Sequence, residues 1–98
     1  MQIEYKSKSL EKVCTDFKEA QKKHGEEMAG LIHQRIYEIM ASDSVETLVS
    51  CGIGRCHALT GDLAGKYAMK LKQPYRLIFA KKGDEIQIVK ILDIKDYH

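Results

Sequence analysis

The fold is decided by residues 66–79, which read KYAMKLKQPYRLIF. Before the chain's single proline, Tyr67, Met69 and Leu71 alternate with small or charged residues, and the alternation resumes after it. A period of two is typical of a strand with one buried face, because successive side chains point to opposite faces of a sheet. The segment therefore predicts two antiparallel strands joined by a tight turn at the proline.

Two further strands are predicted outside this hairpin. Residues 86–94 follow a turn at residues 82–84 and carry branched apolar side chains on both faces, which is typical of a central or well-covered strand. Residues 2–6 read QIEYK and alternate polar with apolar side chains, as a short edge strand does.

Two amphipathic helices are predicted between the first strand and the hairpin. Ser7 and Ser9 are suitable caps for a first helix, whose apolar stripe has the spacing i, i+3, i+4 and i+7. That stripe consists of Leu10, Val13, Cys14 and Phe17. Gly25 interrupts the pattern, and Glu26 and Glu27 then suit the first turn of a second helix. Its apolar face consists of Met28, Leu31, Ile32, Ile36, Ile39 and Met40.

Residues 41–65 break the periodicity with serines and glycines, so we expect a long irregular connection, with a short strand or turn near residues 46–50. Long loops in compact domains are often functional. The predicted order is β-α-α-β-β-β. It describes a two-layer α+β fold, in which a helical hairpin packs on one face of a small, mostly antiparallel sheet. The other face is left partly open as a binding surface.

Length and composition favour one globular domain over residues 1–98. The 98 residues are 44% hydrophobic, which supplies one modest core. Charge is divided unevenly, because residues 1–54 hold 7 basic and 9 acidic residues, whereas residues 55–98 hold 9 and 5. A basic C-terminal half suits a polyanionic partner, although a solvated charged surface would give the same count.

Cysteine usage favours a reducing compartment. Cys14, Cys51 and Cys56 make an odd number, and the sequence shows neither a signal peptide nor an apolar stretch of membrane-spanning length. We therefore expect a cytoplasmic protein without disulfides or membrane contact. The spacing of Cys51, Cys56 and His57 matches no common zinc pattern, so no metal site is expected.

Three motifs in the C-terminal half resemble those of HigB toxins, a branch of the RelE/ParE toxin superfamily. Residues 56–67, CHALTGDLAGKY, resemble the H-x-L-x-G-D-x-x-G-x-[YW] segment of that branch. Residues 74–79, PYRLIF, are similar to its [QNW]-[YW]-R-[IL]-x-F strand, and residues 96–98 resemble its D-Y-H ending. The motifs occur in the family's order, whereas the N-terminal half agrees only in its pattern of elements.

This resemblance implies a RelE-like fold and the toxin of a type II toxin–antitoxin pair. Such a toxin is an endoribonuclease that cleaves messenger RNA in the decoding site of the 30S ribosomal subunit and so inhibits translation. It uses no cofactor. The implied partners are the ribosome, messenger RNA and a HigA-like helix-turn-helix antitoxin.

The resemblance also places catalysis at five positions, which are His57, Arg76, Asp96, Tyr97 and His98. Metal-free RNA cleavage needs a base for the 2′-hydroxyl, an acid for the leaving 5′-oxygen and a cation for the phosphate. Histidine titrates near neutrality, and arginine stays charged and binds phosphate through two N–H donors. We expect His98 or Asp96 to act as base and His57 as acid. Arg76 would stabilise the transition state, and Tyr97 would orient the substrate.

Basic residues of the same half are predicted to bind RNA or the ribosome. Alternation predicts that Lys66, Lys70 and Lys72 share one sheet face, where they would form an electrostatic footprint. The whole predicted set is Arg55, Lys66, Lys70, Lys72, Lys81 and Lys82.

Two positions depart from the family pattern. Many HigB relatives carry Lys where this chain has Thr60, and Pro where it has Ala58. A phosphate-binding cation is therefore missing, and Lys66 and Arg55 are the candidates to replace it. Two other functions stay open: a ParE-like inhibitor of DNA gyrase, and a degenerate toxin that only binds its antitoxin. ParE-like toxins lack the histidine-containing ending, which favours the nuclease.

Overall fold

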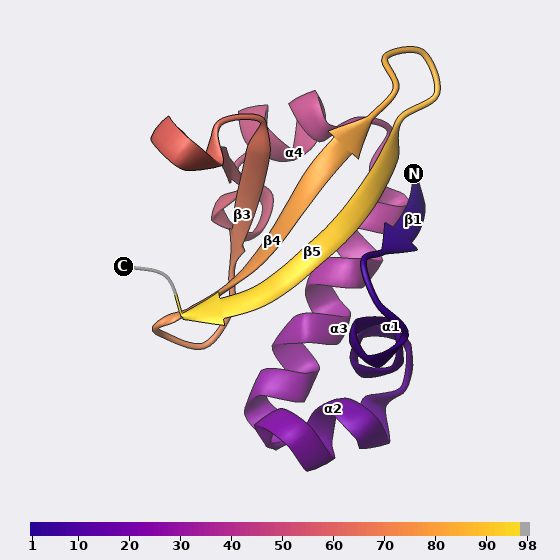
Figure 1. The fold of residues 1–98 in the computed structure, drawn as a ribbon, viewed down its shortest axis with the longest axis vertical. Coiled ribbons are helices and arrows are strands. Elements are labelled where there is room, and N and C mark those ends of the chain that lie inside the picture. Colours follow the sequence, from indigo (N-terminus) through magenta and orange to yellow (C-terminus); the bar gives the residue numbers. More distant parts are fainter. Residues whose placement is uncertain (97–98) are drawn as a thin grey trace.

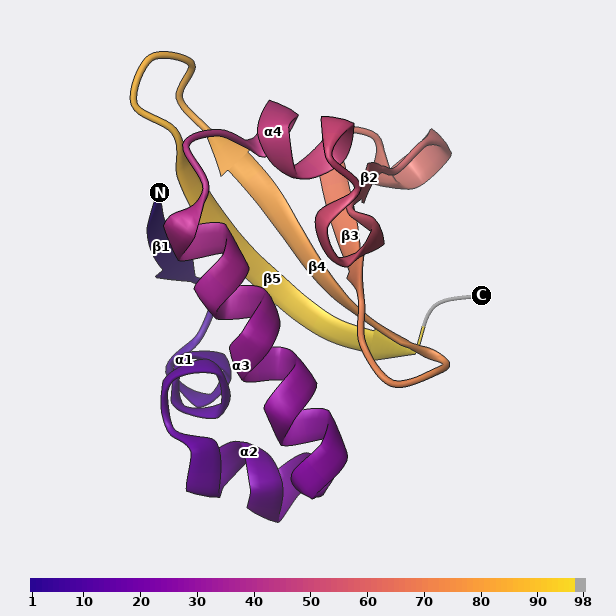
Figure 2. The same cartoon turned by 180° about the vertical axis from the view of Figure 1, so that it is seen from behind.

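The computed structural model describes residues 1–96, in which a five-stranded sheet packs against a layer of helices (Figures 1 and 2). The helices are α1 (Lys8–Thr15), α2 (Phe17–His24), α3 (Glu26–Ala41) and α4 (Val45–Ser50), with single 3₁₀ turns η1 (Ile53–Arg55) and η2 (Gly61–Leu63). The strands are β1 (Gln2–Tyr5), β2 (His57–Ala58), β3 (Lys66–Lys70), β4 (Tyr75–Lys82) and β5 (Ile88–Asp96).

The sheet has the strand order β1-β5-β4-β3-β2. The predicted hairpin is present as β3 and β4, which pair antiparallel from Lys66 opposite Ala80 to Lys70 opposite Arg76. β5 lies between β4 and β1, as predicted for a central strand, and β1 is an edge strand parallel to β5. The fold class, a two-layer α+β domain with a mostly antiparallel sheet, is confirmed.

The two faces of the sheet differ in cover. The helices lie over one face, which contributes alternate side chains such as Met69, Leu77 and Phe79 to the main hydrophobic core (Figure 2). On the opposite face, Ala68 and Ile78 form a small second cluster with Leu59 of the connection before β3. Among residues 1–96 no α-helix crosses that side, which Figure 1 presents to the viewer. We call it the open face.

The first predicted helix is divided into α1 and α2 at Asp16. Ser7 caps α1 as expected, because its Oγ accepts a hydrogen bond from the Leu10 amide at 3.2 Å. Asp16 adopts an extended backbone and caps α2, its carboxylate accepting from the Lys18 amide at 3.0 Å. An Asp side chain competes for backbone amides in this way, which ends one helix and begins another. In the described part of the chain, none of the helices combines the length and apolarity needed to cross a bilayer.

Residues 41–65, which we expected to form a long irregular connection, consist largely of short regular elements. The expectation of a strand or turn near residues 46–50 is wrong, because α4 occupies this segment. Ser44 caps α4 by accepting a hydrogen bond from the Thr47 amide at 3.1 Å. Val45 and Leu48 of this helix are fully buried. Met40, assigned to the core face of α3, is 60% exposed near the end of that helix.

Candidate functional site

One cross-strand row on the open face carries His57. His57 pairs with Ala68, Ala68 with Ile78, and Ile78 with Asp93, so the row crosses β2, β3, β4 and β5. Residues directly opposite one another in a sheet point to the same face. Since Ala68 and Ile78 belong to the open-face cluster, His57 and Asp93 share that face.

A second row on the open face is cationic throughout. Lys70, Arg76 and Lys95 lie directly opposite one another on β3, β4 and β5. Neighbouring strands are about 4.8 Å apart, so this cation row brings three positive side chains within about 10 Å. The same spacings put the Cα atoms of His57 and Arg76 about 12 Å apart, within reach of one bound strand of RNA.

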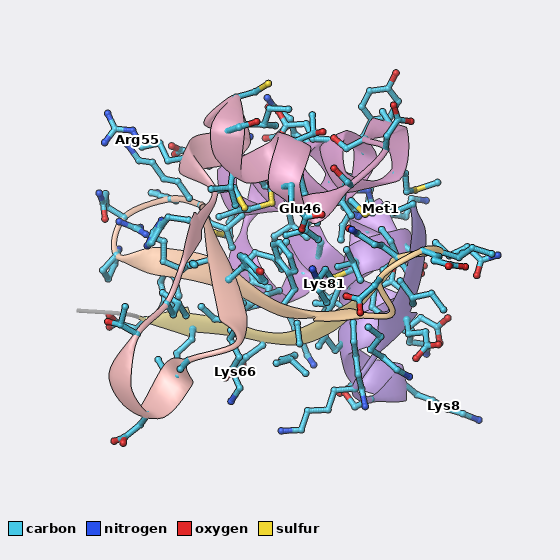
Figure 3. The ribbon with its side chains drawn as sticks, turned by 90° about the horizontal axis from the view of Figure 1, so that it is seen from above. Met1, Lys8, Glu46, Arg55, Lys66 and Lys81 are labelled. Carbon is cyan, nitrogen blue, oxygen red and sulfur yellow. The ribbon has the colours of Figure 1, made fainter. Side chains whose placement is uncertain are left out.

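The cations of the open face are largely unneutralised. Within residues 1–96, Lys66, Lys70 and Lys95 form no ion pair. Lys66 points from the sheet away from the helical layer (Figure 3). An exposed lysine gains little from an acidic neighbour in any case, but a group of unpaired cations creates a positive potential that attracts an anion.

The other predicted lysines are placed differently, and the position of Lys72 corrects the prediction that it shares a sheet face with Lys66 and Lys70. β3 ends at Lys70, and Lys72 beyond it turns to the helices and pairs with Glu27 of α3 at 3.2 Å. Lys81 faces α4 and pairs with Glu46 at 3.2 Å (Figure 3). Lys82 lies near the β1 end and pairs with Glu4 at 2.9 Å. Alternation along one strand could not reveal these partners, which come from other elements.

Arg76 keeps most of its donors available. Its Nη1 donates to Gln73 Oε1 at 3.2 Å and to the Tyr75 carbonyl at 2.9 Å. Among the described residues, its other guanidinium nitrogens have no partner. The side chain is thus fixed at one nitrogen while two others can bind a phosphate.

The His57 ring is oriented by a backbone carbonyl. Its Nδ1 lies 2.9 Å from the Arg55 carbonyl oxygen, which can only accept a hydrogen bond, so Nδ1 carries the proton. The exposed ring therefore presents Nε2, the nitrogen without a proton in this tautomer, to solvent. Arg55 itself has a left-handed backbone with φ +54°, and its side chain points outward and away from Lys66 (Figure 3).

Arg35 of α3 ties the loop before His57 to β3. Its Nε donates to the Lys70 carbonyl at 2.7 Å, and its Nη1 pairs with Glu38 at 3.0 Å. Gly54 packs directly on this side chain, because a Cβ at that position would lie 2.8 Å from Arg35 Cδ and Nε. Arg35 thus contacts the end of β3 at Lys70. At Gly54 it also contacts the loop that leads to Arg55 and His57.

The C-terminal motif lies only partly within the described residues. Asp96 is opposite Tyr75 on β4, next to the Arg76 and Lys95 pair, and strand alternation puts it on the helix-facing side. The predicted site residues Tyr97 and His98 lie outside the described part of the chain.

Sequence reasoning missed three polar residues on this surface. Lys6, Asp93 and Lys95 line one hollow of about 200 Å³ together with Lys66. A register shift opposite Ile78 and Phe79 leaves Leu92 unpaired and puts Asp93 on the open face. No simple alternation along β5 signals this bulge.

Cys56, directly before His57, is buried at 4% exposure. Burial raises the pKa of its thiol to about 11, so the sulfur stays protonated near neutral pH and is a poor nucleophile and metal ligand. In residues 1–96 there is no group of three or more side chains suited to hold a metal ion.

Several solved structures share this fold. The chain matches a YoeB/ParE toxin from Agrobacterium tumefaciens over 100% of both chains, with a TM-score of 0.68 and 16% identity. It also matches a YoeB-YefM complex and a YoeB dimer from Staphylococcus aureus, each over 100% of this chain and 97% of that one, with a TM-score of 0.63 and 23% identity. No protein-family model and no curated protein matches the sequence. At these identities the likeness establishes the RelE/YoeB-like fold.

Proposed function

We propose that this chain is the toxin of a type II toxin–antitoxin pair, of the HigB-like branch, and that it cleaves messenger RNA on the ribosome. The main support for this function is that His57 and Arg76 lie together on the open face. The same face holds three lysines that form no ion pair within residues 1–96, namely Lys66, Lys70 and Lys95. Of the matched structures, one is named a YoeB/ParE toxin and another a YoeB-YefM toxin-antitoxin complex, which supports the same class.

The cation row supplies the electrostatic part of the reaction. Arg76 would bind the scissile phosphate through the guanidinium nitrogens that have no partner in the described residues. Lys70 and Lys95 flank it and would stabilise the charge that gathers on the phosphate oxygens in the transition state. Lys66, on the same face, would replace the cation that Thr60 fails to supply.

His57 supplies the proton for the leaving 5′-oxygen in this proposal. Its Nδ1 is bonded to the Arg55 carbonyl, so Nε2 is the atom that donates. The base that takes the 2′-hydroxyl proton would be His98 or Asp96. Both stay candidates for this role, and Tyr97 would orient the substrate.

The partners follow from this function. A HigA-like helix-turn-helix antitoxin would neutralise the toxin, and the ribosome would present messenger RNA in its 30S decoding site. The protein would act in the cytoplasm. The reaction as written uses side chains and needs no cofactor.

A cleavage assay with purified ribosomes tests this function. Primer extension on a messenger RNA should show toxin-dependent ends only when ribosomes are present. His57→Ala should lower the cleavage rate by about 10²- to 10⁴-fold, the range for losing a general acid. Lys22→Ala removes an exposed lysine of α2 on the helical layer and serves as the matched control, with an unchanged rate.

Other outcomes separate the alternatives. Relaxed DNA accumulating in a gyrase supercoiling assay, without RNA cleavage, would identify a gyrase inhibitor. Antitoxin binding with neither activity would identify a degenerate toxin. Cleavage by His57→Ala at the wild-type rate would contradict the assignment of His57.

A further inference from the structure

The hollow on the open face combines an apolar floor with a polar rim. Ile78, at 4% exposure, packs with the partly buried Leu63 and Leu92 to form the floor. Leu63 comes from η2, which folds toward the open side of the sheet (Figure 3). The hollow measures about 200 Å³, and its rim holds Lys6, Lys66 and Lys95 with one carboxylate, Asp93.

Asp93 is held in this hollow by a β-bulge. Ile78 pairs with Asp93 and Phe79 with Ile91, so Leu92 is the extra residue of β5. Leu92 and Asp93 therefore point to the same face, one to the floor and the other to the rim. Bulges commonly redirect a side chain in this way next to functional sites.

The carboxylate is not neutralised by the lysines around it. Although Asp93 and three lysines line one hollow, no ion pair joins them among residues 1–96. An acidic group on a surface suited to RNA opposes phosphate binding. Its oxygens are instead acceptors for the amino and imino groups on the edge of a base.

We propose that this hollow is a nucleotide subsite in which Asp93 selects a base with an exocyclic amino group. The inference rests on the proposed function of the open face. The flat base would lie against Leu63, Ile78 and Leu92, while the lysines would bind its phosphates. Guanine fits best, because its neighbouring N1–H and N2–H donors can meet both carboxylate oxygens.

The location supports a subsite next to the reacting phosphate. Asp93 is in the same cross-strand row as His57 and is two residues from Lys95 of the cation row. From His57 to Asp93 the row spans three strand spacings, about 14 Å. The base in the hollow would therefore belong to a nucleotide beside the cleaved bond rather than to the cleaved bond itself.

Cleavage of programmed ribosomes tests the subsite. The probe is a set of ribosomes whose decoding-site codons differ at one nucleotide at a time, and the readout is the single-turnover cleavage rate on each. Wild-type protein should prefer guanine over uracil at one codon position by on the order of tenfold, the discrimination expected of a bidentate base contact. Asp93→Asn should abolish that preference.

Two controls separate failure of the subsite from failure of the function. Asp43→Asn makes the same chemical change at an exposed position between α3 and α4, and it should leave both rate and preference unchanged. Lys95→Ala should lower all rates together, since a phosphate contact carries no base information. If the wild-type protein cleaves but Asp93→Asn keeps its base preference, the subsite is wrong. If the wild-type protein cleaves no codon, the proposed function fails instead.

Discussion

Gly54→Ala should destabilise the protein much more than the same change at Gly52. Both glycines have left-handed backbones, with φ +58° at Gly54 and +62° at Gly52, so each alanine variant bears a conformational cost of about 1–2 kcal/mol. At Gly52 an added Cβ meets nothing within 4 Å. At Gly54 it would lie 2.8 Å from Arg35 Cδ and Nε, and 3.0 Å from Met69 Cε.

The Arg35 side chain cannot easily move away from a Cβ added at Gly54. Its side chain is 11% exposed and is fixed by bonds to the Lys70 carbonyl and Glu38. Moving it sacrifices a hydrogen bond from a charged donor, at about 1.5–3 kcal/mol. The total for Gly54→Ala is then about 3–5 kcal/mol, whereas Gly52→Ala should lose only the conformational part. The reduced entropy of the unfolded chain is common to both variants and cancels in the comparison.

Urea denaturation of both variants measures this difference. We expect the free energies of unfolding to differ by about 1.5–3 kcal/mol, which corresponds to melting temperatures roughly 6–24 °C apart for a chain of this size. In an Arg35→Ala background, Gly54→Ala should cost no more than Gly52→Ala. Equal losses for the two glycines in the wild-type background would refute the idea that Arg35 is packed against this loop.

Two further predictions concern charge. Lys95→Ala should lower the salt dependence of association with the 30S subunit, reducing the slope of log K against log salt concentration by about 0.7–0.9. The control variant Lys22→Ala should leave the slope unchanged. Equal slopes for the wild-type protein and both variants would contradict a phosphate contact at Lys95. Burial raises the pKa of both Cys14 and Tyr5 to about 12 from ordinary values of 9.0 and 10.0. The unfolded chain therefore loses these protons first, so the contribution of these two groups to stability should be constant below about pH 8 and fall from pH 9 toward 12. Urea midpoints at pH 8 and 10.5 check this, and Cys14→Ala should make the fall shallower without abolishing it, because Tyr5 and the buried Cys56 still lose their protons first in the unfolded chain.

The amino-acid sequence was sufficient to predict an element where its residue pattern is local and long. The alternation over residues 66–79 predicted β3 and β4, and with them the shared face of Lys66 and Lys70. It was insufficient where one residue redirects the chain. Asp16 divides the first helix by capping α2, and α4 was hidden because two buried residues, Val45 and Leu48, make too short a periodic signal.

The functional site, like the fold, was predicted only where a local motif carried the signal. Motif resemblance selected His57 and Arg76, but only the pairing of the two-residue strand β2 with β3 puts His57 on the open face. The bulge at Leu92 brings Asp93 and Lys95 to that face and turns Asp96 from it, which alternation along β5 alone would predict in reverse. Such a register shift depends on the partner strand, so it has no signature in β5 itself.

The central claim is that the open face cleaves RNA by attack of the 2′-hydroxyl, with Arg76 on the phosphate. The most direct measurement is the chemical identity of the 3′ end left on messenger RNA after a single turnover on programmed ribosomes. The account predicts a 2′,3′-cyclic phosphate or a 3′-phosphate, formed about 10²- to 10³-fold more slowly by Arg76→Ala. A 3′-hydroxyl end, or an Arg76→Ala rate equal to that of the wild-type protein, would contradict it.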